Sequence, residues 1–133
     1  MDNVEEDELR KFNQNLDSYY KGIKSWLERR KPYLRKDFRL LDVADYTPMC
    51  RAYLSKVFNE GFGDSFSSVV KRYRIKEAKR LLESNPDLRL TAVSDLSGFS
   101  SVSSFHRAFA QVCGITPGEY RNKILAEKKK KGI

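Results

Sequence analysis

Apolar residues recur at intervals of three and four positions along most of the chain, which is the spacing of one face of an α-helix. Turn-forming residues interrupt this spacing at Pro32, Pro48, Gly61–Gly63, Asn85–Pro86, Gly98 and Gly114–Pro117. No segment shows the alternation over about four to eight residues, bounded by turn pairs, that indicates a β-strand. The pattern therefore predicts an all-α protein.

Residues 9–30 are expected to form one amphipathic helix. Its apolar positions follow heptad spacing, at Leu9, Phe12, Leu16, Tyr19, Ile23 and Trp26. This spacing is typical of a short parallel coiled coil, which would make the chain a homodimer through residues 9–27. Packing of the helix on its own domain explains the pattern equally well, because the seam is short and Tyr20 and Leu27 widen the apolar stripe.

The following segment pairs a short helix with a longer one. The short helix is predicted by apolar Leu40, Leu41, Val43 and Ala44. It should end near Tyr46, because Pro48 disfavours the helical conformation in the residue before it. The longer helix is expected from about Arg51 to Glu60, and it buries Leu54, Val57 and Phe58. A helix, a tight break and a second helix form a helix-turn-helix.

The same order returns about fifty residues later, which indicates an internal duplication. A long helix over Phe66–Ser84 ends at Asn85–Pro86. A short helix then covers Thr91–Ser97, with Thr91 as its cap and Gly98 as its stop. A further helix over about Ser101–Val112 is expected to bury Val102, Phe105, Phe109 and Val112.

These elements divide the chain into three parts. Residues 1–37 form an N-terminal helix, linker or dimerisation segment; residues 38–123 form a double helix-turn-helix domain; residues 124–133 form a basic tail. Within the domain, residues 38–63 are the first unit, 64–85 the linker helix and 86–123 the second unit. The predicted fold is thus all-α, with two homeodomain-like helix-turn-helix subdomains, a long linker helix and an extra N-terminal amphipathic helix.

The chain is basic, with a formal net charge of +8. Half of the excess lies in Lys128–Lys131, which is expected to be a solvated, disordered tail. A net positive charge is compatible with nucleic-acid binding but does not establish it. The positions of the exposed polar residues carry the stronger evidence.

Each longer helix leaves a polar face opposite its apolar side. On the second, this face is centred on Ser103 and Arg107 and flanked by Ser104, His106 and Gln111. On the first, Ala52 and Lys56 point outward, flanked by Arg51, Ser55 and Asn59. Arginine and lysine can donate to guanine O6 and N7, and serine can bond either kind of base edge. Any soluble helix has a polar face, but two at equivalent points of a repeat, without a carboxylate near the tip, favour the DNA major groove.

The linker helix has a suitable length for such binding. A helix over Phe66–Ser84 spans roughly 28 Å at about 1.5 Å per residue. Successive major grooves on one side of B-DNA lie about 34 Å apart. One chain could therefore place both polar helices in adjacent major grooves.

Other classes of function find little support. Cys50 and Cys113 lie far apart and the single histidine has no metal-ligand spacing, so neither a disulfide, a metal site nor a cofactor is expected. Free thiols fit the cytoplasm. No long apolar run predicts a membrane span, and the acidic start is unlike a secretory signal. No nucleophile, phosphate loop or paired acid indicates an enzyme. A helical protein-interaction module remains the alternative.

Three segments resemble the AraC/XylS family of bacterial transcriptional regulators. They are RIKEAKRLL (Arg74–Leu82), GFSSVSSFHRAFAQVCGITPGEYR (Gly98–Arg121) and YLSKVFNEGFGDSF (Tyr53–Phe66). The resemblance covers about residues 38–123. It implies a seven-helix, two-unit domain that binds double-stranded DNA at promoters, most often as an activator that works with RNA polymerase.

The resemblance also implies which side chains contact bases. They are Arg51, Ala52, Ser55 and Lys56 in the first unit and Ser103, Ser104 and Arg107 in the second. Arg74 and Arg121 are expected to brace helices. The chain departs from the family pattern at Ser94, at Arg39 and at Cys50, which stands where a serine cap is common. Many members carry a preceding sensory domain, for which the 37 residues before the matched region are too few. The chain is therefore either a stand-alone regulator or the output part of a longer sensor, and its heptad-spaced helical start favours the second.

Overall fold

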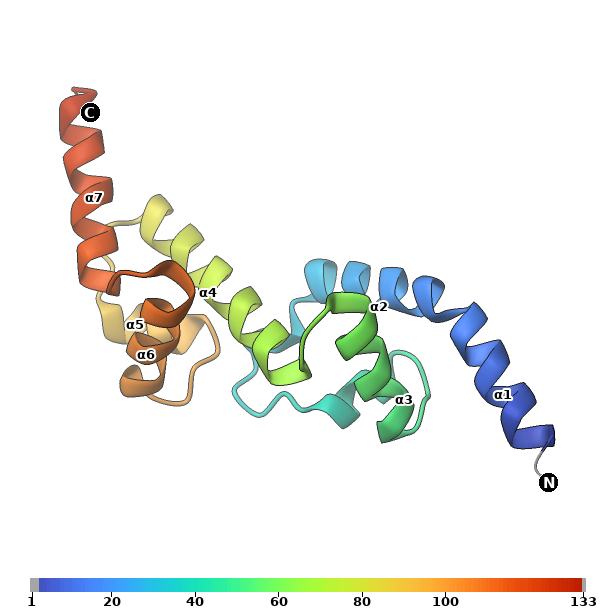
Figure 1. Cartoon of the computed structure of the whole chain (residues 1–133). Helices are drawn as coiled ribbons and strands as arrows, with labels where there is room; N and C mark the ends of the chain where they lie inside the picture. Colours follow the sequence, from blue (N-terminus) through green and yellow to red (C-terminus); the bar gives the residue numbers. More distant parts are fainter. Residues whose placement is uncertain (1–2, 133) are drawn as a thin grey trace. The chain divides into compact units, whose positions relative to one another are not determined.

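The computed structural model describes residues 3–132; residues 1, 2 and 133, at the ends of the predicted N-terminal segment and basic tail, lie outside the described residues. Within this range the regular elements are all helical, which confirms the predicted all-α class (Figure 1). In chain order they are α1 (Asn3–Gln14), α2 (Leu16–Arg30), η1 (Pro32–Leu34), η2 (Leu40–Asp45), α3 (Arg51–Lys56), η3 (Val57–Phe62), α4 (Phe66–Ser84), α5 (Leu90–Leu96), α6 (Val102–Cys113) and α7 (Pro117–Lys130).

The chain forms two compact units. The first comprises the described residues up to Pro32 together with Phe38–Val69, and the second comprises Tyr33–Asp37 together with the described residues from Val70 onward. The linker helix α4 has the predicted bounds, Phe66–Ser84, and it contributes its first residues to one unit and the rest to the other. Each unit contains a helix-turn-helix, with η2 and α3 in the first and α5 and α6 in the second.

The predicted single helix over residues 9–30 is wrong, because it is interrupted at Asn15. The backbone of Asn15 has φ −102° and ψ 5°, outside the helical range, and its side-chain amide donates to the carbonyl oxygen of Lys11 at 2.9 Å. Asparagine competes for local backbone groups in this way, which favours helix ends over helix interiors. α1 and α2 are consequently two helices that change direction at one residue (Figure 1).

The apolar seam of the N-terminal helices is used mainly inside the first unit. Phe12 is 4% exposed, and Ile23 and Leu27 are fully buried. α2 packs against η3, and the Trp26 ring stacks on Tyr46 with centroids 5.1 Å apart. Packing on the chain's own domain therefore accounts for these positions. A homodimer through residues 9–27 stays a prediction.

The helix-turn-helix of the first unit has an irregular geometry. The short apolar helix is a 3₁₀ helix, η2, and its Leu41 is exposed rather than buried. The longer helix begins at Arg51 as predicted but continues past Glu60 in wider π-type turns, η3, to Phe62. Gly63, with φ 79°, ends it. Val43, Leu54, Val57 and Phe58 have no exposed surface and form the core.

The second unit is more regular. α5 begins one residue earlier than predicted, after Arg89, so Thr91 lies inside the helix and is not its cap. Gly98, the predicted stop of this helix, has a positive φ of 92°. A Cβ at this position would lie 2.6 Å from the carbonyl oxygen of Tyr33, so the turn also requires a close backbone approach.

α6 buries Phe105, Ala108 and Phe109, but two predicted core positions are wrong. Val102 is only half-buried and Val112 is 41% exposed, so neither belongs to the buried core of the second unit. Residues that complete this core include Ile75 and Leu82 of α4 and Val93 of α5.

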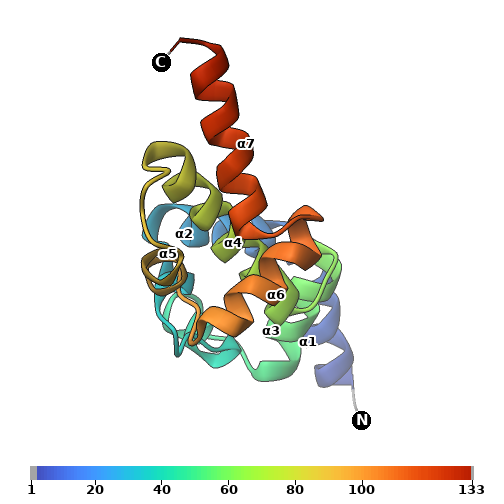
Figure 2. The same cartoon turned by 90° about the vertical axis from the view of Figure 1, so that its left-hand side faces the viewer.

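The predicted disordered tail is instead helical. α7 runs from Pro117 to Lys130 and includes most of the lysine run (Figure 2). Its start is fixed by a capping box, in which Thr116 and Glu119 exchange backbone-to-side-chain hydrogen bonds. Near its end, the Lys128 ammonium donates to the carbonyl oxygen of Glu83 at 3.3 Å, which holds the helix against the end of α4.

Candidate nucleic-acid interface

α6 presents a firmly built polar face. Ser101 is its N-cap, and the Ser101 hydroxyl oxygen accepts a hydrogen bond from the backbone N–H of Ser104 at 3.1 Å. The same hydroxyl lies 2.9 Å from the hydroxyl of Ser104. Phe105 and Phe109 anchor the opposite side of the helix with no exposed surface. Because one end is capped and one side is anchored, the outward side chains project from a well-held helix.

The three predicted residues of the second unit all lie on α6. Ser103 and Arg107 are exposed, and Ser104 is half-buried. One guanidinium nitrogen of Arg107 lies 3.5 Å from the Ser104 hydroxyl. Among the described residues Arg107 has no carboxylate partner, so its charge is available to an anionic ligand. The Ser104 hydroxyl already has local partners and is the least available of the three.

The four predicted residues of the first unit lie on α3. Arg51 and Ala52 are exposed, whereas Ser55 and Lys56 are half-buried. Leu54 of α3 and Phe58 of η3, which continues the helix, fix its other side in the core. α3 starts less firmly than α6, because Cys50 occupies the N-cap position and makes no side-chain capping bond.

A carboxylate lies farther along this face. Glu60 follows Lys56 by one helical turn, and its carboxylate pairs with the Lys56 ammonium at 3.5 Å. The Lys56 side chain is 31% exposed and that of Glu60 is 52% exposed, so solvent weakens the pair. The i, i+4 spacing of lysine and glutamate is visible in the sequence and was the available signal.

Two arginines within the family motifs have structural partners, as expected. Arg74 donates to the carbonyl oxygens of Tyr33 at 2.7 Å and of Arg35 at 2.9 Å, and burial lowers its pKa. Arg121 donates to the carbonyl oxygen of Leu88. These side chains hold the segment after α2 and the turn after α4 in the second unit, and they do not belong to the polar face of α6.

Gln111 and Ser94 make hydrogen bonds that connect α6 to its neighbouring helices. Gln111 accepts a hydrogen bond from the Lys71 ammonium of α4 at 3.0 Å, so this edge of α6 is tied to the linker helix. Ser94, where the family usually has alanine, is buried and its hydroxyl lies 3.3 Å from the carbonyl oxygen of Ser101. The serine thereby bridges α5 and the start of α6, a contact that the sequence did not indicate.

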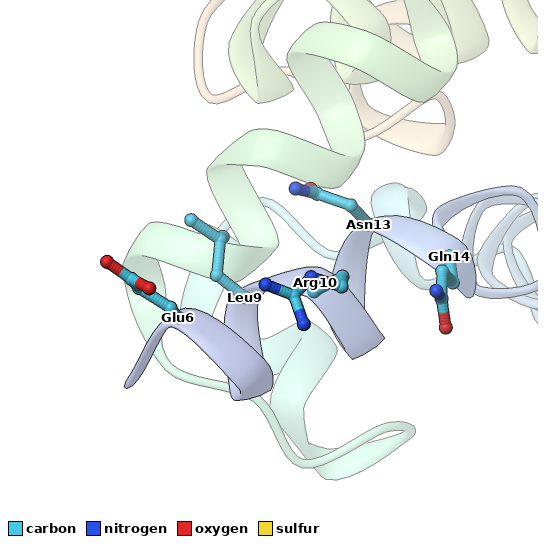
Figure 3. Close-up of a pocket in the computed structure, with 5 residues that line it drawn as sticks. All are labelled: Glu6, Leu9, Arg10, Asn13 and Gln14. Atoms are coloured by element: carbon cyan, nitrogen blue, oxygen red, sulfur yellow. The ribbon is translucent and has the colours of Figure 1, made fainter. Parts of the chain in front are cut away.

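Other kinds of site are not supported within residues 3–132. Cys50 and Cys113 are free thiols, and burial raises the pKa of Cys113. The described residues contain no group of three or more histidine, cysteine or acidic side chains placed to hold a metal ion. None of the described helices is long and apolar enough to cross a bilayer. A shallow hollow on α1 is lined by residues of that helix alone (Figure 3).

Comparison with known proteins identifies the domain. The family model "Helix-turn-helix domain" matches residues 43–123, more than half of the chain. The regulatory protein PocR of Salmonella typhimurium is 31% identical over 123 residues, which cover 92% of this chain and 40% of PocR. The chain spans less than half the length of PocR and of two other curated relatives that it matches.

Solved structures of other proteins share this fold. The C-terminal domain of the two-component response regulator yesN from Fusobacterium nucleatum has 28% identity and a TM-score of 0.66, covering 74% of this chain and 93% of that domain. A probable AraC family transcriptional regulator from Rhodopseudomonas palustris shares the fold at 21% identity and a TM-score of 0.69, covering 80% and 97%. With its motifs, its family match and its two helix-turn-helix units, the chain belongs to the AraC/XylS family of helix-turn-helix transcriptional regulators.

Proposed function

We propose that this chain binds specific double-stranded DNA sites and regulates transcription, with α6 as its principal recognition helix. The observation that supports this most directly is the exposed pair Ser103 and Arg107 on a helix that is capped at its start and anchored by two buried phenylalanines. An exposed, unpaired guanidinium on a rigid helix can donate two hydrogen bonds to guanine O6 and N7. The chain acts in this proposal by binding and not by catalysis.

Each side chain has a distinct role in this proposal. Arg107 contacts a guanine, Ser103 bonds a neighbouring base edge, and Ser104 keeps the arginine oriented through its hydroxyl. In the first unit, Arg51 and Lys56 supply the cationic contacts. Ser55 and Ala52 make the smaller contacts there, a hydrogen bond and an apolar contact with a thymine methyl.

The proposal extends to the arrangement on DNA. α4 has 19 residues, and about 1.5 Å per residue gives roughly 28 Å, close to the separation of about 34 Å between successive major grooves. We infer that α3 and α6 occupy adjacent major grooves in the complex, so that one chain contacts two half-sites.

Several partners follow from the family and belong to the same proposal. The domain would act in the cytoplasm as the output part of a longer sensor and would recruit RNA polymerase as an activator. A homodimer through residues 9–27 would rest chiefly on Leu9 of α1, which is exposed. Phe12 and Ile23 of the seam are buried in the first unit, and the remaining seam positions are half-buried.

A selection followed by a substitution tests the function. Genomic fragments bound by the 133-residue chain should share a site of roughly 20 base pairs, about two successive helical turns. Arg107→Ala should then weaken binding to that site by about 1–3 kcal/mol and relax the preference at one base pair. Lys129→Ala, on the exposed end of α7, is the control and should leave sequence preference unchanged. Equal affinity of the unmodified chain for all fragments would refute the proposal.

A further inference from the structure

The first turn of α3 lacks the stabilisation that the first turn of α6 has. The first N–H groups of a helix have no partner within the helix, and an N-cap serine satisfies one of them. Ser101 does so for α6, at 3.1 Å from the N–H of Ser104. Cys50, at the same position of α3, makes no such bond. α3 is only six residues long before it continues into the π-type turns of η3, and a helix of this length depends on packing against its neighbours.

A side chain from α1 lies against this weak turn. The ring of Phe12 stacks on the ring of Tyr53, the third residue of α3, with centroids 4.2 Å apart and planes at 21°. Tyr19 of α2 stacks on the same phenylalanine at 5.6 Å and 23°. Phe12 is only 4% exposed, so the contact removes most of an aromatic side chain from water. Stacked aromatic pairs of this kind stabilise beyond the area that they bury.

The break at Asn15 belongs to the same arrangement. It lies three residues after Phe12 and lets α1 point in a different direction from α2. The position of α2 is fixed by the burial of Ile23 and Leu27. The side-chain amide of Asn15 donates a hydrogen bond to the carbonyl oxygen of Lys11, next to Phe12, and so stabilises the backbone at the break. α1 lies outside residues 43–123, the range that the helix-turn-helix family model covers. Its contact with α3 is therefore an addition to the domain that the family model describes.

We infer that Phe12 is a positioning residue for DNA recognition: its stack on Tyr53 offsets the stabilisation that an N-cap would give α3, and it holds Arg51 and Ala52 in helical geometry. The inference rests on the proposed function for its consequence at DNA. The structural part stands alone, because it concerns the order of the first turn of α3 in the free chain.

Amide hydrogen exchange in the free chain tests the structural part. The N–H of Leu54 donates to the carbonyl oxygen of Cys50 at 3.0 Å and reports closure of the first turn. Phe12→Ala should speed exchange at Leu54 by about 5–10-fold, the factor that corresponds to loss of a typical cap. Phe12→Ala with Cys50→Ser should restore slow exchange, because serine can cap. Val4→Ala, at a 71% exposed position of α1, is the control and should change nothing.

The same variants test the consequence at DNA. Phe12→Ala should lose discrimination at the base pairs contacted by α3 and keep it at those contacted by α6, and Cys50→Ser should rescue it. Unchanged exchange at Leu54 in Phe12→Ala would overturn the inference. So would faster exchange throughout α2 and η3 without rescue, because that shows a general loss of folding. Absence of sequence selection by the unmodified chain, with the exchange results as expected, would instead count against the proposed function alone.

Discussion

In the first unit Val43, Leu54 and Phe58 have no exposed surface, and in the second unit Val93, Phe105 and Phe109 have none. The valines lie 50 positions apart, and Leu54 and Phe58 lie 51 positions before Phe105 and Phe109. The turn of the second unit is therefore one residue longer, while the buried anchors of the continuous α3–η3 helix and of α6 keep the same spacing. This equivalence extends to the glycines with positive φ that end the two helices, Gly63 and Gly114.

The two units differ where their helices meet solvent. α6 starts at a serine cap, whereas α3 starts at an uncapped cysteine next to the Phe12–Tyr53 stack. Glu60 pairs with Lys56 in the first unit, and the equivalent position of the second carries neutral Gln111. The repeat thus retains its core residues and varies its helix caps and surface charges. α6 has a capped first turn, and its Arg107 has no carboxylate partner among the described residues, whereas Lys56 of α3 is paired with Glu60. We therefore expect α6 to contribute more to DNA binding.

The largest effects should come from the equivalent core positions. Phe58→Ala and Phe109→Ala should each cost about 3–5 kcal/mol of unfolding free energy, the usual range for a buried phenylalanine. The single tryptophan, Trp26, lies in the first unit, so its fluorescence follows that unit while circular dichroism follows both. Phe58→Ala should shift the fluorescence transition, and Phe109→Ala should shift mainly the circular dichroism transition. Equal fluorescence shifts would show that the two units unfold as one.

Glycine substitutions should separate a special turn from the shared helix ends. Gly98→Ala should cost about 2–4 kcal/mol of unfolding free energy, since positive φ costs about 1–2 and the 2.6 Å approach of the new Cβ to the Tyr33 carbonyl oxygen adds a steric penalty. Gly63→Ala and Gly114→Ala should cost only the first part, because no atom lies within 4 Å of their Cβ positions. Denaturant unfolding of the three variants measures this. A cost at Gly63 as large as at Gly98 would contradict it.

Much of this architecture could be predicted from the sequence. The bounds of α4 were predictable because a strongly periodic segment meets Asn85–Pro86, and the outward positions of α6 followed from its apolar side. Helical periodicity cannot show which neighbour covers a residue, so exposed Val112 was placed in the core. The break at Asn15 escaped because the heptad spacing continues across it.

The start of α7 could be read from the sequence, whereas the contact between α1 and α3 could not. The Thr116–Glu119 capping box with Pro117 between them is a helix start that the lysine-rich tail obscured. The Phe12–Tyr53 stack joins residues 41 positions apart and depends on tertiary packing that no local pattern records. Which site residues contact bases stays a prediction in both units.

A smaller effect should follow from the charge difference between the units. Glu60→Gln removes a carboxylate beside Lys56 and should strengthen DNA binding by about 2–5-fold at low salt, since the lysine gains freedom and repulsion from phosphate falls. Gln111→Glu places the carboxylate at the equivalent position of α6 and should weaken binding by a similar factor. Titrations with the selected site at two salt concentrations measure both variants. If both substitutions strengthened DNA binding, or if neither changed it, the charge at these positions would not account for the difference between the units.

The smallest expected effect is a pH dependence confined to the second unit. The pKa of Glu119 is lowered mainly because its carboxylate accepts the backbone N–H of Thr116 at 2.9 Å, and the Thr116 side chain contributes. A carboxylate whose pKa is lower in the folded than in the unfolded state stabilises the fold above its ordinary pKa of about 4.3, and this contribution disappears as the pH falls through the folded-state value. Glu119→Gln should therefore be slightly less stable than the unmodified chain at pH 7 and equally stable near pH 2.5. Thermal unfolding from pH 7 downward, with the exchange of the Thr116 amide as a local probe, measures the difference. A stability difference that stays constant over this range would mean that the charge of Glu119 plays no part in starting α7. The second unit would then have no acid-sensitive group at this helix start, and this pH dependence would not distinguish it from the first unit.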